Sequence, residues 1–250
     1  MARDSKKRKK SKQHQKTHRS RETFSILEQT SKQKQFDFAE VFRHIRTNIE
    51  YSTMDTELKS ICVVSTQSGE AKSTCAMNLA YIFAAKYERV LLVDCDLRKR
   101  MVHRYMNLPN DEGLSDALRE YTKTHAINPK YFQRITHESF SGYLSVLTAG
   151  TKVPNPSEML SSQTFANFMR DLKDDYDFII VDCPPAMQTS DPIPVGNAVD
   201  GALFVVSAQD TKRNDAAAAV KLLQRNQVNV IGSVLTKAEA EGSSYYYYYY

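Results

Sequence analysis

The segment that most constrains the fold of this 250-residue chain runs from Ile61 to Thr74 and reads ICVVSTQSGEAKST. Its first four residues are apolar and predict a short buried strand, and a loop containing Gly69 follows. Lys72-Ser73-Thr74 then begins a segment whose apolar residues recur to about Lys86, which predicts a helix. A strand, a loop and a Lys-Ser pair at a helix start are typical of a phosphate-binding loop. The alternative is an ordinary strand and helix joined by a turn.

The residues of this loop suggest how it would hold phosphate. Backbone N–H groups would face the phosphates, the Lys72 ammonium would add positive charge and the Ser73 hydroxyl would ligate magnesium. The match to the pattern G-x-x-x-x-G-K-[ST] is imperfect, because Thr66 and Ala71 occupy its glycine positions. A methyl group at position 71 is tolerated if φ stays negative and otherwise crowds the backbone near the phosphate. The predicted nucleotide-binding residues are Gly69, Glu70, Ala71, Lys72, Ser73 and Thr74.

Two later apolar segments end in aspartates. VLLVDCDLR places Asp94 and Asp96 after one predicted strand, and FIIVDCPP places Asp182 after another. A single aspartate at a strand end is usually a cap or turn residue. The carboxyl ends of parallel strands share one sheet edge, however, so the loop and both aspartate motifs would converge there into a magnesium–nucleotide site. The predicted metal ligands, directly or through water, are Ser73, Asp182 and an aspartate of the first motif, and the spacing alone does not divide the roles of Asp94 and Asp96.

The chain alternates predicted strands and helices from residue 61 onward. Strands interleaved with helices of about 10–15 residues imply β-α-β units and a mostly parallel sheet covered on both faces. We therefore expect an α/β fold like that of P-loop NTPases. Residues 122–143 are the least regular part. The predicted strands are 61–64, 90–93, 144–147, 178–181, 202–206 and 228–235, and the predicted helices start at 73 and cover 114–121, 162–172 and 215–225.

The three motifs in this order resemble the Walker A, A′ and B motifs of bacterial tyrosine kinases, the cytoplasmic kinases of capsule and exopolysaccharide synthesis. The resemblance extends from about Phe38 to Tyr250. It includes EVFRHIR from Glu40, similar to an ExxRxxR oligomerisation motif, and AGTKVPNPSEML from Ala149, which matches the segment between A′ and B. A terminal tyrosine cluster, Tyr245–Tyr250, is a further shared feature.

The resemblance implies an ATP- and Mg²⁺-dependent protein-tyrosine autokinase that regulates surface polysaccharide production. It assigns Lys72 and Asp94 to catalysis, with Asp94 accepting the tyrosine proton. It assigns Asp96 to the metal, and Arg98 to a contact with phosphate or a neighbouring subunit.

The sequence departs from the family pattern at Ser68, which replaces a proline, at Ala71, which replaces a glycine, and at Thr236. Relatives often place at this last position an asparagine thought to read the base. One rival interpretation is a partition- or septum-positioning ATPase, but this chain has Gln67 where such proteins carry a signature lysine. The other is a non-catalytic scaffold, against which the retention of Lys72 and all three aspartates argues.

Residues 36–54 predict an amphipathic helix, since apolar residues recur there at helical spacing. Glu40, Arg43 and Arg46 form a charged band beside the apolar stripe. This band is either a solvated helix face with an internal Glu–Arg pair or, as the resemblance implies, an intersubunit salt-bridge set in a homo-oligomer. In such an oligomer the tail of one subunit would enter the site of its neighbour.

The last six residues are Tyr245, Tyr246, Tyr247, Tyr248, Tyr249 and Tyr250. A run of six tyrosines cannot present one apolar face, and the preceding EAEGSS is expected to be flexible. We predict that this tail is the substrate of the kinase itself. Each phosphate adds roughly −1.5 to −2 charges, so several would repel one another and favour disassembly of the oligomer. A low-complexity or sticky tail is the alternative.

The net charge of +5 is unevenly distributed. Residues 1–21 contain ten Lys or Arg and one acid, whereas residues 22–250 contain 24 basic and 28 acidic residues. We expect a disordered basic tail over 1–35, a kinase domain over 36–238 and a flexible tail over 239–250. The basic tail would be attracted to an anionic membrane surface, or would merely solubilise the chain; no specific nucleic acid is expected.

No apolar run approaches the roughly 20 residues of a transmembrane helix, and no secretory signal follows the basic start. The chain is therefore expected to be cytoplasmic. The resemblance implies a transmembrane activator or adaptor whose cytoplasmic tail docks on the kinase and recruits it to the inner face of the membrane, and a cognate tyrosine phosphatase. We expect buried, reduced thiols, with sensitivity to oxidation as the alternative, at Cys62, Cys75, Cys95 and Cys183.

Overall fold

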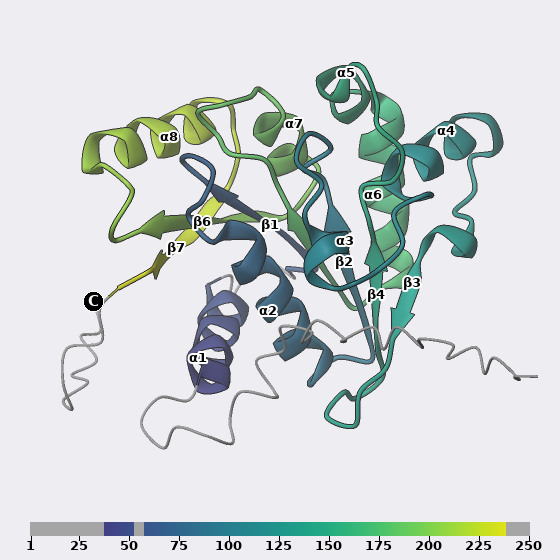
Figure 1. Cartoon of the computed structure of the whole chain (residues 1–250), viewed down its shortest axis with the longest axis horizontal. Coiled ribbons are helices and arrows are strands. Elements are labelled where there is room, and N and C mark those ends of the chain that lie inside the picture. The colour runs from purple at the N-terminus through teal and green to yellow at the C-terminus, as the bar shows by residue number, and fades with distance from the viewer. Residues whose placement is uncertain (1–37, 53–57, 239–250) are drawn as a thin grey trace, which may run out of the picture.

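The computed structural model describes residues 38–52 and 58–238, and Figure 1 shows how these residues are arranged. The predictions for residues 1–35 and 239–250 lie outside the described residues. The strands of the described part are β1 (Ser60–Ser65), β2 (Arg89–Asp94), β3 (Gln133–Ile135), β4 (Tyr143–Leu147), β5 (Phe178–Asp182), β6 (Gly201–Ser207) and β7 (Val230–Thr236). They form one sheet of order β3-β4-β2-β5-β1-β6-β7. All neighbours pair in parallel except β3, which runs antiparallel to β4 at one edge.

Helices cover both faces of this sheet (Figure 1). The bounds are α1 (Phe38–Tyr51), α2 (Lys72–Ala84), α3 (Val102–Tyr105), α4 (Leu114–Thr124), η2 (Pro129–Tyr131), α5 (Pro156–Leu160), α6 (Gln163–Asp175), α7 (Pro192–Asn197) and α8 (Arg213–Arg225). The core on one face includes α1, α2 and α3, and the core on the other includes α4, α6, α7 and α8. Alternate residues of β1 enter the two cores, as the two-residue period of a strand requires: Cys62 and Val64 on one side, Ile61 and Val63 on the other.

The α/β architecture and the mostly parallel sheet are as predicted. Each predicted strand and helix is present, and no end is shifted by more than three residues. Five short elements were not predicted: α3, η2, β3, α5 and α7. Two of them, η2 and β3, lie in the irregular segment 122–143. None exceeds six residues, and such elements are too short to show a periodicity of their own.

All four cysteines are buried and none is in a disulfide, as the sequence predicted. Burial, with a smaller effect from Asp182, raises the pKa of Cys75 to about 12. Burial also raises the pKa of Cys95 and Cys183 well above the usual range. Because the thiolate is the reactive form, these thiols are poor nucleophiles in the folded chain.

Candidate active site

The carboxyl ends of β1, β5 and β2 lie side by side at the centre of the sheet. Residue Val63 of β1 pairs with Asp182 of β5, and Asp182 pairs with Asp94 of β2. The three motifs therefore converge on one edge, as the parallel arrangement predicted.

The loop between β1 and α2 contains two residues with positive φ. Gly69 has φ +93° and Ala71 has φ +64°. The sequence left open whether φ at position 71 stays negative; in the structure it does not. A non-glycine residue in this left-handed region costs roughly 1–2 kcal/mol. Ala71 therefore adopts a backbone conformation that favours glycine, at an energetic cost that other contacts of the loop must offset.

Lys72 begins α2 and its ammonium is buried against two carboxylates. Its Nζ lies 2.5 Å from Asp182 Oδ1 and 3.9 Å from Asp96 Oδ2, and it contacts the Ser73 hydroxyl at 3.3 Å. Burial opposes the charged form, but Asp182 and Asp96 outweigh it and raise the pKa of Lys72. The lysine therefore stays protonated at neutral pH.

Asp182 is fully buried and only half satisfied. Oδ1 pairs with Lys72, whereas Oδ2 has no hydrogen-bond partner among the described residues. Burial raises the pKa of this carboxyl, against opposing effects of Lys72 and the Ser73 hydroxyl. A buried oxygen without a partner is costly, and a hard cation or a metal-bound water is a fitting partner for it.

The two aspartates of the A′ motif differ in their surroundings. Asp94 is fully buried, and its oxygens accept N–H groups of Asp96 at 3.1 Å and Val102 at 3.3 Å. Burial, followed by the charge of Asp182, raises the pKa of Asp94 well above its usual value. Asp96 caps the following turn through Lys99 N–H at 3.0 Å and reaches the cavity wall.

A cavity of about 420 Å³ opens beside these groups. Five of the six predicted nucleotide-binding residues line it, together with Asp96. The sequence did not single out Lys99, Met101 and Tyr105, although the first two follow Asp96 closely enough to have been considered. The lining residues are Ser65, Gln67, Ser68, Gly69, Ala71, Lys72, Ser73, Thr74, Asp96, Lys99, Met101, Tyr105 and Pro185.

Glu70 is the predicted loop residue that does not line the cavity. Its side chain is fully buried and accepts the Gln67 N–H at 2.9 Å and the Thr211 hydroxyl. Its carbonyl accepts the Thr236 hydroxyl at 2.9 Å. Any contact of this residue with a nucleotide is therefore left to its backbone.

Arg98 is held inside its own chain. Nε lies 2.9 Å from Asp191 Oδ2, and Nη2 donates to the Ser157 hydroxyl at 2.9 Å. Both predicted contacts of this residue, with phosphate or with a neighbouring subunit, would have to compete with this pair.

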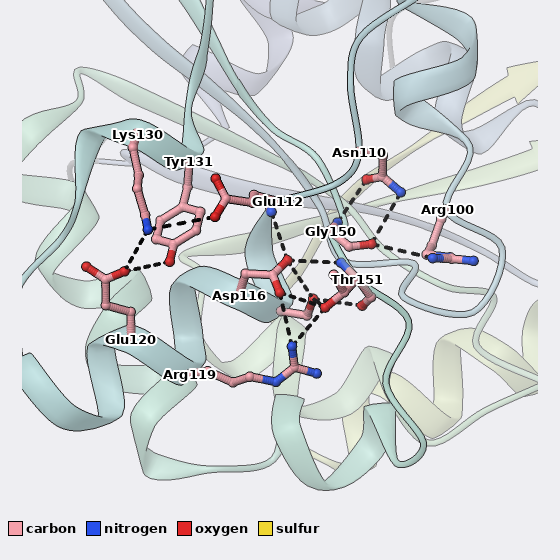
Figure 2. Close-up of polar contacts among 12 residues, drawn as sticks. Arg100, Asn110, Glu112, Asp116, Arg119, Glu120, Lys130, Tyr131, Gly150 and Thr151 are labelled. Carbon is pink, nitrogen blue, oxygen red and sulfur yellow. Dashed lines mark hydrogen bonds and ion pairs between the residues drawn. The ribbon is translucent and has the colours of Figure 1, made fainter.

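Asp116 organises a second polar network beside the site, shown in Figure 2. Its carboxylate accepts N–H groups of Gly113 at 3.1 Å and Thr151 at 3.0 Å, the Thr151 hydroxyl at 2.6 Å, and Arg119 at 3.0 Å. Burial alone would raise the pKa of Asp116, but the contacts with Thr151, Gly113 and Arg119 outweigh it and lower the pKa. The network fixes the start of α4 to the segment that follows β4.

The neighbouring residue Gly150 connects this network to the A′ segment (Figure 2). It has φ +80°, its N–H donates to Asn110 at 2.8 Å, and its carbonyl accepts Arg100 at 3.4 Å. The segment AGTKVPNPSEML is therefore anchored at its start to the chain that leaves Asp96.

The charged band of α1 is divided in the structure. Arg43 pairs with Glu40 at 2.6 Å within the helix, and both side chains are about half exposed. Arg46 instead donates to the carbonyl of Ile82 at 2.8 Å and is largely buried. It fastens α1 to α2, so an intersubunit role for this arginine remains a prediction.

The described residues hold neither a preformed metal cluster nor a membrane-spanning helix. Residues 38–52 and 58–238 contain no group of three or more His, Cys, Asp or Glu side chains placed to hold a metal. Magnesium at a nucleotide site needs only one or two carboxylates, because phosphates and water supply the remaining ligands. No helix in these residues has the length and apolarity to span a bilayer.

A family model described as an AAA domain matches residues 58–198. The chain is 36% identical over 197 residues to the tyrosine-protein kinase YwqD of Bacillus subtilis (strain 168), a match covering 79% of this chain and 80% of YwqD. It is 34% identical over 212 residues to CapB of Staphylococcus aureus, a putative tyrosine-protein kinase by name, covering 85% and 90% of the two chains.

Solved structures agree with these matches. The crystal structure of the chimerical protein CapA2B2 superposes with a TM-score of 0.73 at 33% identity, covering 84% of this chain and 88% of that one. A ParA family ATPase from Chlorobium tepidum TLS, at 17% identity and a TM-score of 0.59, shares the fold and covers 74% and 76% of the two chains.

The fold and the phosphate loop define the class as P-loop nucleotide-binding proteins of α/β architecture. Within that class, identities of 34–36% over most of two kinases are decisive. The chain belongs to the bacterial tyrosine-protein kinases, as the three motifs predicted.

Proposed function

We propose that this chain is the ATP-dependent tyrosine autokinase of a capsule or exopolysaccharide system, and that it phosphorylates tyrosines 245–250 of its own tail. The observation that carries the proposal is the group formed by Lys72, Asp96 and Asp182 at the N-terminus of α2. It combines a protonated ammonium, a carboxylate on the cavity wall and a buried carboxylate oxygen that lacks a partner among the described residues.

The chain's own residues supply the binding of nucleotide. Backbone N–H groups of residues 69–74 and the start of α2 favour anionic phosphate, and Lys72 adds a full charge. Lys72 Nζ lies 2.5 Å from Asp182 Oδ1. Phosphates bound in the cavity would compete with Asp182 for this ammonium.

The residues present also fit magnesium. Ser73, Asp96 and Asp182 would hold it, directly or through water. Asp182 Oδ2, which has no hydrogen-bond partner in the described part of the chain, supports this assignment. When bound, the ion neutralises charge on the phosphates during transfer.

The transfer itself moves the terminal phosphoryl group of ATP to a tyrosine oxygen, whose proton must pass to a carboxylate. The resemblance gives this role to Asp94. Because Asp94 is fully buried and bonded to backbone N–H groups, the segment between Asp94 and Val102 has to open before this carboxylate can meet a tyrosine. Asp96 lines the cavity without such a change.

The partners follow from the resemblance. A homo-oligomer assembled through Glu40, Arg43 and Arg46 would present one subunit's tail to the next. A transmembrane activator or adaptor with a cytoplasmic tail would complete the site and recruit the kinase to the inner face of the membrane, where the basic residues before position 22 favour an anionic surface. A cognate phosphatase would reverse the modification.

The test is incubation of the full chain with ATP and Mg²⁺, followed by mass spectrometry of the C-terminal peptide. Lys72→Met is compared with Lys123→Met, which removes an exposed lysine from the last turn of α4. Each protein is tested with and without an activator tail fused to it. We expect phosphate on the terminal tyrosines in the parent and in Lys123→Met, and none in Lys72→Met.

Other outcomes distinguish the alternatives. Nucleotide hydrolysis without tyrosine phosphorylation, even with the activator tail, would contradict the autokinase. Absence of nucleotide binding in every form would favour the scaffold interpretation.

A further inference from the structure

Two residues at which this chain departs from its family pattern, Ala71 and Thr236, are linked through Glu70. The hydroxyl of Thr236, the last residue of β7, donates to the carbonyl of Glu70 at 2.9 Å, and the carbonyl of Val206 lies farther from it, at 3.3 Å. The Glu70 carbonyl belongs to the peptide bond that leads into Ala71, where φ is +64°. Ala71 and Thr236 are therefore far apart in sequence, but the hydroxyl of Thr236 bonds to the peptide group that joins Glu70 to Ala71.

Holding this carbonyl fixes the direction of the next N–H. A trans peptide is planar, and its C=O and N–H point in opposite directions. With the Glu70 carbonyl bonded to Thr236, the Ala71 N–H points away from β7. Ala71 lines the cavity, so this N–H is one of the donors available to phosphate.

The Glu70 side chain is fixed from a second direction. Its carboxylate is fully buried and accepts the N–H of Gln67 at 2.9 Å and the hydroxyl of Thr211. Thr211 in turn accepts the Ser207 N–H at 2.8 Å, which leaves its single hydroxyl proton for Glu70. The loop is therefore tied to the ends of both β6 and β7.

We propose that Glu70, Thr211 and Thr236 form a clamp that positions the phosphate loop, and that Thr236 offsets the strain of alanine at position 71. Neither threonine lines the cavity, so both act through the loop rather than by touching the nucleotide. A glycine at position 71 would adopt the left-handed conformation without strain. With alanine there, the hydrogen bond from Thr236 stabilises this conformation instead. This inference rests on the proposed nucleotide binding at the same site.

The test is a double-mutant cycle on binding of a fluorescent ADP analogue to the full chain. Thr236→Val removes the hydroxyl while keeping the shape, Thr236→Ser restores the hydroxyl, and Ala71→Gly removes the strain. We expect Thr236→Val to weaken binding by about fivefold to tenfold, as for one lost hydrogen bond, and Thr236→Ser to restore it. In the Ala71→Gly background, Thr236→Val should reduce the affinity for the ADP analogue clearly less, because glycine adopts the left-handed conformation without support.

A matched control is Thr122→Val, which removes a hydroxyl that donates to the Leu118 carbonyl at 2.8 Å in α4, away from the loop. It should leave ADP binding unchanged. Equal losses from Thr236→Val in the two backgrounds, or no loss in either, would overturn the proposal.

A second measurement keeps the clamp testable if the parent binds no nucleotide, a result that would count against the proposed function alone. Amide hydrogen exchange of a peptide covering residues 66–72 should be faster in Thr236→Val than in the parent, and near the parent rate in Thr236→Ser and Thr122→Val. Unchanged exchange in Thr236→Val would contradict the clamp, whether or not nucleotide binds.

Discussion

Asp116 and Asp182 differ in how fully the protein satisfies their carboxylates and in the direction of their pKa shifts. Asp116 receives two backbone N–H groups, a hydroxyl and an arginine, and these contacts lower its pKa. Asp182 is more deeply buried, pairs with the Lys72 ammonium and leaves Oδ2 without a partner among the described residues, and burial raises its pKa. A carboxylate that the protein satisfies completely serves the structure, whereas one left incomplete serves a ligand that arrives later.

The largest expected effect follows from replacing the incomplete carboxylate. Asp182→Asn should slow tail phosphorylation by about 10²–10³-fold, because the neutral amide no longer stabilises the positive charges of Lys72 and of bound magnesium. Initial rates with ATP and Mg²⁺ measure it. Asp116→Asn should keep a rate near that of the parent at a temperature where both are folded, and a comparable loss in the two variants would remove the distinction between them.

The next effect concerns stability of the Asp116 network. A Cβ at Gly113 would lie 2.3 Å from the Thr148 carbonyl oxygen and 2.5 Å from the Gly150 nitrogen. Gly113→Ala should lower the free energy of unfolding by about 2–3 kcal/mol, since backbone atoms cannot move aside cheaply. Urea unfolding measures this change. Gly232→Ala, whose Cβ would meet only Leu203 Cδ1 at 4.0 Å, is the matched control and should change stability much less.

Asp116→Asn should lower the free energy of unfolding by about 1–2 kcal/mol at pH 7, because the amide cannot accept all the hydrogen bonds of the carboxylate. The sign of the pH dependence follows from the lowered pKa: the folded state binds fewer protons than the unfolded state. The difference in free energy of unfolding between the parent and Asp116→Asn should be fully present above about pH 4. It should become smaller as the pH falls further. A difference that stays constant through this range would show that the charge of Asp116 is not what stabilises the network.

The smallest expected effect concerns the thiols beside the site. With a pKa of about 12, Cys75 should resist alkylation by iodoacetamide at pH 8 in the folded chain and react only on unfolding. Mass spectrometry after timed labelling checks this. Rapid labelling of native Cys75 would instead support the alternative of a site sensitive to oxidation.

The sequence predicted the sheet and the convergence of its three motifs for a simple reason. Buried parallel strands have short, continuous apolar sequences, and their carboxyl ends meet at one edge of the sheet. The loop lysine and the aspartates could therefore be assigned to one site from their places at the ends of these apolar sequences. Lys72, Asp94, Asp96 and Asp182 do meet there.

What the sequence could not show depends on residues far apart in the chain. The inward turn of Glu70 requires Thr211, 141 positions away, and the left-handed Ala71 is supported by Thr236, 166 positions from Glu70. The engagement of Arg98 requires Asp191, 93 positions away. Short elements such as α3 and α7 are likewise fixed by packing rather than by their own pattern.

The assignment of Asp182 as the incomplete carboxylate of a magnesium–nucleotide site is tested by calorimetric titration of ADP with and without Mg²⁺. In the parent, we expect Mg²⁺ to tighten ADP binding. In Asp182→Asn that tightening should disappear, while binding of ADP without Mg²⁺ persists; in Asp116→Asn it should remain. Full retention of the Mg²⁺ effect in Asp182→Asn would contradict the assignment.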